Sequence, residues 1–304
     1  MTTITILDGG MGKELRRIGA PFRQPEWSAL ALLEAPEFVA WAHRNFVDAG
    51  AEVIITNTYS LVPFHIGEER FVSRGVELAT LAGEIARLVA DAADRPVKVA
   101  GSLPPLFGSY EPAKFQPDAA PAMWRTLIEA QAPYVDLWVG ETISSIEEAV
   151  VLMETLATSG QNKPVWLAFS LADHLSDGAP VLRSGEAVSS IADLEGDIEA
   201  VLFNCSQPEV ITPAVAELAA NLHPGTRLGA YANAFPVLQI GEDGYSANEV
   251  IVERRADLTA DRYRELAVEW VNAGASIVGG CCDIYPEHIV ALAEAFGGDR
   301  SERG

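Results

Sequence analysis

Eight short runs rich in β-branched and aromatic residues recur along the chain, and helical patterns lie between them. The runs are ITILD (4–8), EVIITN (52–57), VKVAGS (97–102), VDLWVGE (135–141), VWLAFSL (165–171), AVLFN (200–204), RLGAYAN (227–233) and SIVGG (276–280). The intervening segments repeat apolar residues at spacings of three and four, as amphipathic helices require. Eight strand–helix units are the count of a (β/α)8 TIM-type barrel, which we expect residues 1–304 to form as a single α/β domain.

The connections between these segments predict which face of the barrel carries the active site. Several turns from helix to strand are short, whereas four connections from strand to helix are long (58–75, 103–120, 172–187 and 232–259). In TIM barrels the loops that follow the strands build the C-terminal face, where the active site lies. An open doubly wound sheet would instead need a G-x-G-x-x-G turn after its first strand, and DGGMGKEL (8–15) does not match that pattern.

The composition of the chain limits the classes of binding partner and the cellular compartments that are expected for it. Acidic residues outnumber basic ones by 43 to 21, and the net charge of −22 would repel the phosphates of nucleic acids. No run approaches eighteen apolar residues, so no membrane span is predicted, and MTTITILDGG (1–10) lacks the basic region of a signal peptide. We therefore expect a cytoplasmic protein that acts on small molecules, with monomer and homo-oligomer both open.

The chain contains only three cysteines, and each follows a predicted strand. Cys205 ends the sixth run, and Cys281 and Cys282 follow the eighth run directly. The ends of these two strands face the same side of a parallel barrel and lie near one another around its rim. Three thiolates that converge select Zn²⁺ and leave its fourth position open, as in catalytic zinc sites. The alternative is that they are small buried hydrophobic residues.

A zinc ion with three thiolate ligands favours sulfur chemistry over hydrolysis. The thiolates donate charge to the metal, which makes it a weak Lewis acid toward water but a good host for a fourth thiolate. Hydrolytic metal sites commonly use clustered histidines, and the five histidines here, at 43, 65, 174, 223 and 288, include no closely spaced pair. We therefore expect transfer of an alkyl group onto a substrate thiol.

Several motifs resemble those of the homocysteine S-methyltransferases, with the S-methylmethionine-dependent type the nearest. They are DGGMG (8–12), TNTY (56–59), ETISS (141–145), HLSDG (174–178), NCS (204–206) and GGCC followed by PEHI (279–289). The resemblance extends from residue 6 to about residue 296 and implies a (β/α)8 barrel. It also implies that the three cysteines are the catalytic zinc ligands, and that Asp8 and Glu141 receive the ammonium group of homocysteine.

The residues themselves agree with this assignment. Asp8 and Glu141 end the first and fourth runs, where a buried carboxylate needs a cation, a role that a substrate ammonium would fill. A salt bridge or a helix cap is the alternative for each of them.

Further substrate-binding candidates lie at the same rim. Thr56, Asn57 and Asn204 offer hydrogen bonds to a substrate, although each could instead satisfy loop backbone. Trp27 and Tyr59 could contact a cationic methyl donor through cation–π interactions, or could simply pack.

The expected reaction is direct displacement of a methyl group from a cationic donor by the zinc-bound thiolate of homocysteine, which yields methionine. S-methylmethionine and S-adenosylmethionine are the favoured donors. The alternatives are a betaine-like donor, a different thiol or selenol acceptor, and a non-catalytic zinc- or thiol-binding barrel. Lys13 and the loops 101–120 and 231–258 depart from the family pattern, and they would influence the choice of donor.

Overall fold

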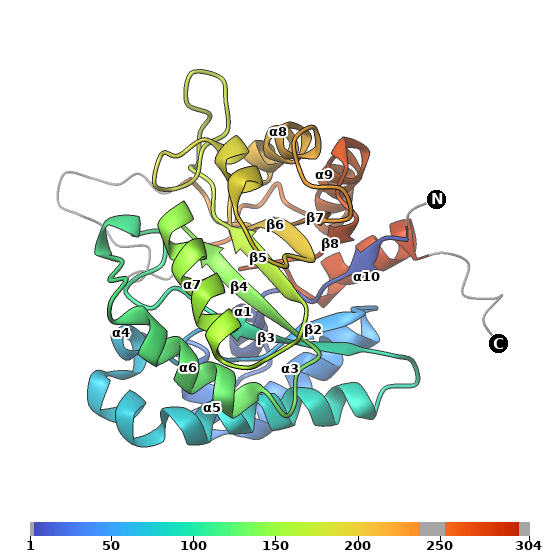
Figure 1. Ribbon diagram of the computed structural model, residues 1–304. Coiled ribbons are helices and arrows are strands. Elements are labelled where there is room, and N and C mark those ends of the chain that lie inside the picture. The colour runs from blue at the N-terminus through green and yellow to red at the C-terminus, as the bar shows by residue number, and fades with distance from the viewer. Residues whose placement is uncertain (1–2, 238–252, 298–304) are drawn as a thin grey trace.

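The computed structural model describes residues 3–237 and 253–297, which form a parallel β-barrel surrounded by helices (Figure 1). The strands are β1 (Thr5–Ile6), β2 (Val53–Ile55), β3 (Lys98–Leu103), β4 (Leu137–Ile143), β5 (Val165–Phe169), β6 (Ala200–Asn204), β7 (Arg227–Tyr231) and β8 (Ile277–Val278). Each strand pairs in parallel with its neighbour in the order β1-β8-β7-β6-β5-β4-β3-β2. The predicted (β/α)8 TIM-type barrel is therefore confirmed.

Backbone hydrogen bonds connect the two ends of this sheet. The amide of Glu52 donates to the Ile6 carbonyl oxygen at 2.7 Å, and the amide of Asp8 donates to the Val53 carbonyl oxygen at 3.0 Å. Since β1 also pairs with β8, the first and last strands lie side by side. This closure brings the end of β1 to the same rim as the ends of β6 and β8.

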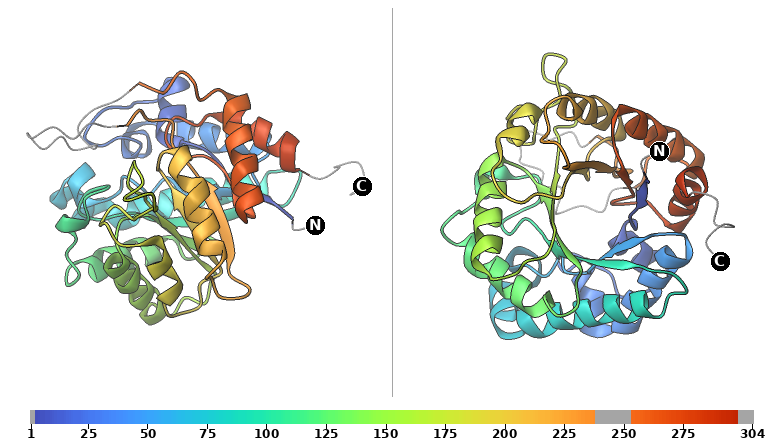
Figure 2. Two further views of the ribbon diagram at one scale, coloured as in Figure 1. Left: turned by 90° about the horizontal axis from the view of Figure 1, so that it is seen from above. Right: turned by 45° about the vertical axis from the view of Figure 1, so that its right-hand side comes forward.

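Helices form an outer ring around the strands (Figure 2). They are α1 (Met11–Arg17), α2 (Ala29–Glu34), α3 (Pro36–Asp48), α4 (Pro63–Ile66), α5 (Glu68–Asp91), α6 (Ala120–Gln131), α7 (Ile146–Thr158), α8 (Pro208–Ala219), α9 (Ala260–Ala273) and α10 (Pro286–Phe296), with 3₁₀ helices η1 (Pro112–Lys114) and η2 (Val188–Asp193). Within residues 3–237 and 253–297, every helix is too short or too polar to cross a membrane.

Among the described connections, the structure differs from the sequence prediction in three, and residues 238–252 of the predicted connection 232–259 lie outside the described residues. The segment 58–75 is not one long loop, because α4 lies within it and α5 already begins at Glu68. The connection between β3 and β4 contains α6, which the sequence pattern did not single out. Between β5 and β6, a fully described connection, the helical element is η2 and no α-helix occurs, so one of the eight units departs from the expected strand–helix repeat.

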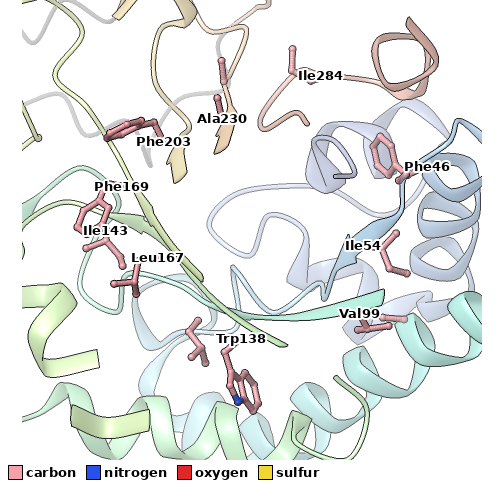
Figure 3. Close-up of a cluster of buried hydrophobic side chains, with 14 of the residues drawn as sticks. Phe46, Ile54, Val99, Trp138, Ile143, Leu167, Phe169, Phe203, Ala230 and Ile284 are labelled. Carbon is pink, nitrogen blue, oxygen red and sulfur yellow. The ribbon is translucent and has the colours of Figure 1, made fainter. Parts of the chain in front are cut away.

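Two layers of apolar side chains hold the barrel together. Along β4, Leu137 and Val139 belong to the cluster inside the barrel, whereas Trp138 packs with the cluster between sheet and helices (Figure 3). This alternation is the two-residue period of a strand that is buried on both faces. Glu141 continues the inward series, and its carboxylate meets the hydroxyl of Tyr231 on β7, across the barrel. The strand pattern thus directs a carboxylate to the inner rim.

Candidate active site

A cavity of about 160 Å³ opens at the C-terminal ends of the strands. Its wall combines the loop after β1 with the ends of β2, β4, β6, β7 and β8. Nine of the ten site residues predicted from the sequence line it: Asp8, Trp27, Thr56, Asn57, Tyr59, Glu141, Cys205, Cys281 and Cys282. The site therefore lies at the face where the long connections predicted it.

The three cysteine sulfurs converge at one point of this cavity. All three Sγ atoms lie within 4.8 Å of one another, and the Cys205 and Cys282 sulfurs are 3.8 Å apart. A Cβ atom at Gly280 would collide with the side chain of Ile284, so glycine is needed where β8 passes into the cysteine pair. Three soft sulfur donors at this spacing fit a zinc ion, with a fourth position left for a substrate atom.

The thiols differ in acidity. Hydrogen bonds from Cys281 and Cys282, supplemented by one from the Tyr110 hydroxyl, lower the pKa of Cys205 well below its ordinary value, although burial opposes this. The contact with Cys205 raises the pKa of Cys281 and of Cys282 well above the ordinary value, and burial adds to the increase for both thiols. The acidities of the three thiols are therefore linked, and a divalent cation that bound all three sulfurs would favour the thiolate form of each.

Two buried carboxylates face the same cavity. Burial raises the pKa of Asp8 well above its ordinary value, although the Ile55 amide donates a hydrogen bond to it at 2.8 Å. Burial also raises the pKa of Glu141 to about 7, against hydrogen bonds from Ser102 Oγ at 2.6 Å and Tyr231 Oη at 3.3 Å. Neither carboxylate has an ion pair within the described residues, so a cationic ligand would find two acceptors here.

The lysine that lines the cavity does not neutralise these carboxylates. Lys13 Nζ lies 2.9 Å from Asp283 Oδ2, and both side chains are buried. The Asp283 carboxylate also accepts a hydrogen bond from the Tyr285 hydroxyl at 2.9 Å. This ion pair connects α1 to the residue that follows the cysteine pair.

The predicted polar residues divide into two groups. Thr56 and Asn57 line the cavity, but Thr56 Oγ1 donates to Gln131 Oε1 at 2.6 Å and Asn57 Nδ2 donates to the Ser28 carbonyl at 3.0 Å. Asn57 thus makes a contact with backbone, the alternative considered for it, whereas Thr56 bonds a buried side chain. Contacts within the protein thus already use part of the hydrogen-bonding capacity of the Thr56 and Asn57 side chains.

Asn204 does not line the cavity. It is fully buried, and its carboxamide bonds the Thr142 amide and hydroxyl, both at 3.0 Å. Thr142 lies where the register between β4 and β5 shifts, and its φ is +56°. Asn204 therefore stabilises the irregular end of β4 that presents Glu141.

The two predicted aromatic residues contribute to the cavity wall. Trp27 packs edge-to-face against Phe22, with ring centres 5.6 Å apart, and its buried indole Nε1 has no hydrogen-bond partner within the described residues. The Tyr59 hydroxyl shares a hydrogen bond of 2.7 Å with Ser109 Oγ. Both rings are therefore available to a ligand as apolar and π surface.

Sequence reasoning missed Tyr110, which donates a hydrogen bond from its hydroxyl to Cys205 Sγ at 2.8 Å. It lies in the segment 101–120, which the sequence marked only as divergent. It does not follow a predicted strand directly, as the three cysteines do, so no periodic signal identified it.

Strained backbone is concentrated around this cavity. Six described non-glycine residues have a positive φ, and five of them either line the cavity or adjoin a lining residue: Trp27, Tyr110, Thr142, Cys205 and Asp283. Such conformations are unfavourable for side chains with a Cβ and persist where the surrounding structure imposes them. Their clustering supports a functional role for this face of the barrel.

Comparisons with known proteins agree on one family. The family model described as homocysteine S-methyltransferase matches residues 5–296. Homocysteine S-methyltransferase of Escherichia coli K12 is 31% identical over 310 residues, covering 95% of this chain and 94% of the relative. Selenocysteine methyltransferase of Astragalus bisulcatus is 26% identical over 332 residues, with 97% and 93% covered. The crystal structure of the metallated homocysteine methyltransferase MmuM from E. coli superposes with a TM-score of 0.75 at 26% identity, covering 96% of each chain.

Proposed function

Since this chain belongs to the homocysteine S-methyltransferase family and is a methyltransferase, we propose that it methylates the thiol of homocysteine with the aid of zinc. The methyl donor in this proposal is a cationic sulfonium compound, S-methylmethionine or S-adenosylmethionine. The observation that supports the proposal most strongly is that one cavity contains both a possible metal site and possible acceptors for an ammonium group. Three converging sulfurs lie beside two buried carboxylates that have no ion pair within the described residues.

An amino-acid thiol fits this arrangement at both of its ends. Asp8 and Glu141 would hold the ammonium group, and their negative charges would be restored as the cation binds. Cys205, Cys281 and Cys282 would hold zinc, which when bound lowers the pKa of a substrate thiol and keeps it as a thiolate. The ammonium and the thiol of one substrate are thereby fixed together, which orients the nucleophile.

The chemical step needs no covalent bond to the protein. The homocysteine sulfur forms a bond to the methyl carbon as the bond between that carbon and the donor sulfonium breaks, and the electron pair stays on the donor sulfur. The thiol proton has already left to solvent. The chain's contribution to this step is alignment and the exclusion of water by the aromatic wall of Trp27 and Tyr59.

The same wall supports a cationic donor over a neutral one. Aromatic faces attract sulfonium and quaternary ammonium groups by about 0.5–2 kcal/mol each. A betaine-like donor would meet the same rings and is therefore the competing donor class. A selenol is the competing acceptor, because a selenocysteine methyltransferase is among the relatives and a soft selenolate suits the same metal.

Three further properties complete the proposal. We propose that residues 1–304 act as one domain, that the protein works in a reducing compartment such as the cytoplasm, and that its partners are small molecules. A reducing compartment would keep the three closely spaced thiols available for metal.

The test is a methyl-transfer assay with homocysteine and a panel of four donors: S-methylmethionine, S-adenosylmethionine, betaine and dimethylsulfoniopropionate. We expect methionine from the first two, with zinc bound at one equivalent per chain. Selenocysteine and homocysteine compared as acceptors at equal concentration identify the preferred nucleophile. Methionine formation at an unchanged rate after zinc has been fully removed would contradict the zinc-dependent mechanism.

A further inference from the structure

Tyr110 reaches the thiol cluster from the connection between β3 and α6. Its hydroxyl donates a hydrogen bond to Cys205 Sγ at 2.8 Å. Its φ of +64° places a bulky aromatic residue in the left-handed region, two residues after Gly108, which has a φ of +141°. A conformation this unfavourable is retained where several contacts impose it, so the position of the ring is specified rather than incidental.

A second connection fixes the ring of Tyr110. The Arg183 guanidinium lies 4.9 Å from the ring centre, and Asp173 holds that guanidinium with two hydrogen bonds of 2.7 and 3.1 Å. The Arg183 amide in turn donates to the Ser170 carbonyl, directly after β5, at 3.1 Å. The bidentate pair is 16% and 15% exposed, so water screens it little. The loops that follow β3 and β5 thus meet at the ring of Tyr110.

The contact with sulfur is particular to this tyrosine. Two other tyrosines line the cavity, but the Tyr59 hydroxyl bonds Ser109 and the Tyr231 hydroxyl bonds Glu141. Asn233 Nδ2 lies 3.9 Å from the Cys205 sulfur, a much longer contact. Outside the cysteines themselves, Tyr110 is therefore the strongest hydrogen-bond donor that the described residues offer to this sulfur.

We propose that Tyr110 is a positioning residue of the metal site, whose hydroxyl orients Cys205 Sγ and withdraws electron density from it. This inference rests on the proposed function, because it takes the three cysteines as zinc ligands. Hydrogen bonds to a metal ligand fix its direction and tune the metal, and their loss commonly weakens metal affinity by about 10–100-fold. A Cys205 thiolate that donates less charge leaves the metal more attractive to the thiolate of a substrate.

The test compares the wild type with Tyr110→Phe, which keeps the ring and removes the hydroxyl. Both proteins are loaded with Co²⁺, whose charge-transfer absorption from sulfur reports the electron density on the thiolates. We expect the band of the variant at lower energy, because a thiolate without its hydrogen bond gives up an electron more readily. Competition with a chromophoric chelator should show Zn²⁺ affinity reduced by about tenfold or more.

Two more variants keep the test decisive. Tyr59→Phe removes a hydroxyl from the same cavity without touching sulfur, and its Co²⁺ band should stay at the wild-type energy. Arg183→Gln releases the ring but leaves the Tyr110 hydroxyl in place, and it should shift the band in the same direction by a smaller amount. Wild-type band energy and Zn²⁺ affinity in both Tyr110→Phe and Arg183→Gln would overturn the inference. A wild-type protein that binds neither Co²⁺ nor Zn²⁺ would instead overturn the proposed function.

Discussion

Replacing Glu141 by glutamine is expected to stabilise the free protein above neutral pH and to weaken its binding of homocysteine. The carboxyl group is 7% exposed, and burial raises its pKa from an ordinary 4.5 to about 7. Between these two pH values the unfolded chain has released the proton that the folded chain still holds. Folding stability therefore falls as the pH rises through this window, and it remains lower above pH 7.

The size of the effect follows from the same two pH values. At about 1.4 kcal/mol per pH unit, an interval from 4.5 to about 7 corresponds to about 3 kcal/mol. Glutamine does not titrate, so the difference in unfolding free energy between variant and wild type should grow by about that amount between pH 4 and pH 8. A changed hydrogen bond to Ser102 or Tyr231 would add a constant offset but no pH dependence.

Urea unfolding of zinc-free, reduced protein across this pH range measures the difference. Glu148→Gln is a matched control, because Glu148 is also buried with a pKa of about 7 but bonds the Ser144 amide at the start of α7, outside the cavity. Each variant should lose the part of the pH dependence that its own carboxyl group contributes, but Glu141→Gln alone should bind homocysteine about 30-fold or more weakly, as expected when a buried charge pair loses one partner. A stability difference that does not change with pH, or equal homocysteine binding by both variants, would refute the reasoning.

Three further changes test the metal site and its supports. Cys282→Ala removes one of the three proposed sulfur ligands. Zinc content measured by elemental analysis should therefore fall well below one per chain, and turnover should be lost. Full zinc occupancy with unchanged turnover would contradict the three-thiolate site. Gly10→Ala would place a Cβ 2.6 Å from the Cys281 carbonyl oxygen, so the free energy of unfolding measured in urea should fall by about 1–3 kcal/mol. A variant as stable as the wild type would show that the backbone moves to accommodate the methyl group at no cost. Lys13→Met leaves Asp283 buried without this partner, so the free energy of unfolding should fall by about 3–5 kcal/mol in thermal or urea unfolding. Adding Asp283→Asn should restore part of that loss. Equal stability of the single and double variants would exclude this coupling.

The barrel was predictable because its strands are buried on both faces and therefore appear as continuous apolar runs. The missed helix α6 has a proline at its second position, Pro121, in a segment rich in loop residues. Proline is tolerated in the first turn of a helix because the backbone N–H groups there have no hydrogen-bond acceptor within the helix. In a sequence, however, a proline usually indicates that a helix ends or is absent. Between β5 and β6, Leu171 and Leu182 pair as an antiparallel bridge, and the helical element that follows is η2.

The sequence could predict only those residues of the candidate site that lie at or near the ends of strands. Cys205, Glu141 and Asp8 follow or end strands, and parallel strands end at one rim. Asn204 also ends a strand, but the next residue has a φ of +48°, and this turn sends the cysteine into the cavity and leaves the asparagine behind it. Tyr110 depends on a loop conformation that leaves no periodic trace in the sequence. Its role therefore required the structure.

The three sulfurs come from strands at the sixth and eighth places of the chain, and the eighth strand, Ile277–Val278, pairs with both β7 and β1. Cys205 is separated from Cys282 by 77 positions, so the set of three sulfurs is incomplete until both β6 and β8 have been synthesised. Metal binding by all three thiols, if the proposed site is correct, would then coincide with docking of β8 against β1. Zinc would bind only the closed barrel in this way, which makes it a ligand of the native state that stabilises closure by mass action. Loss of the C-terminal strand would thus abolish the sheet closure and the metal site in a single event.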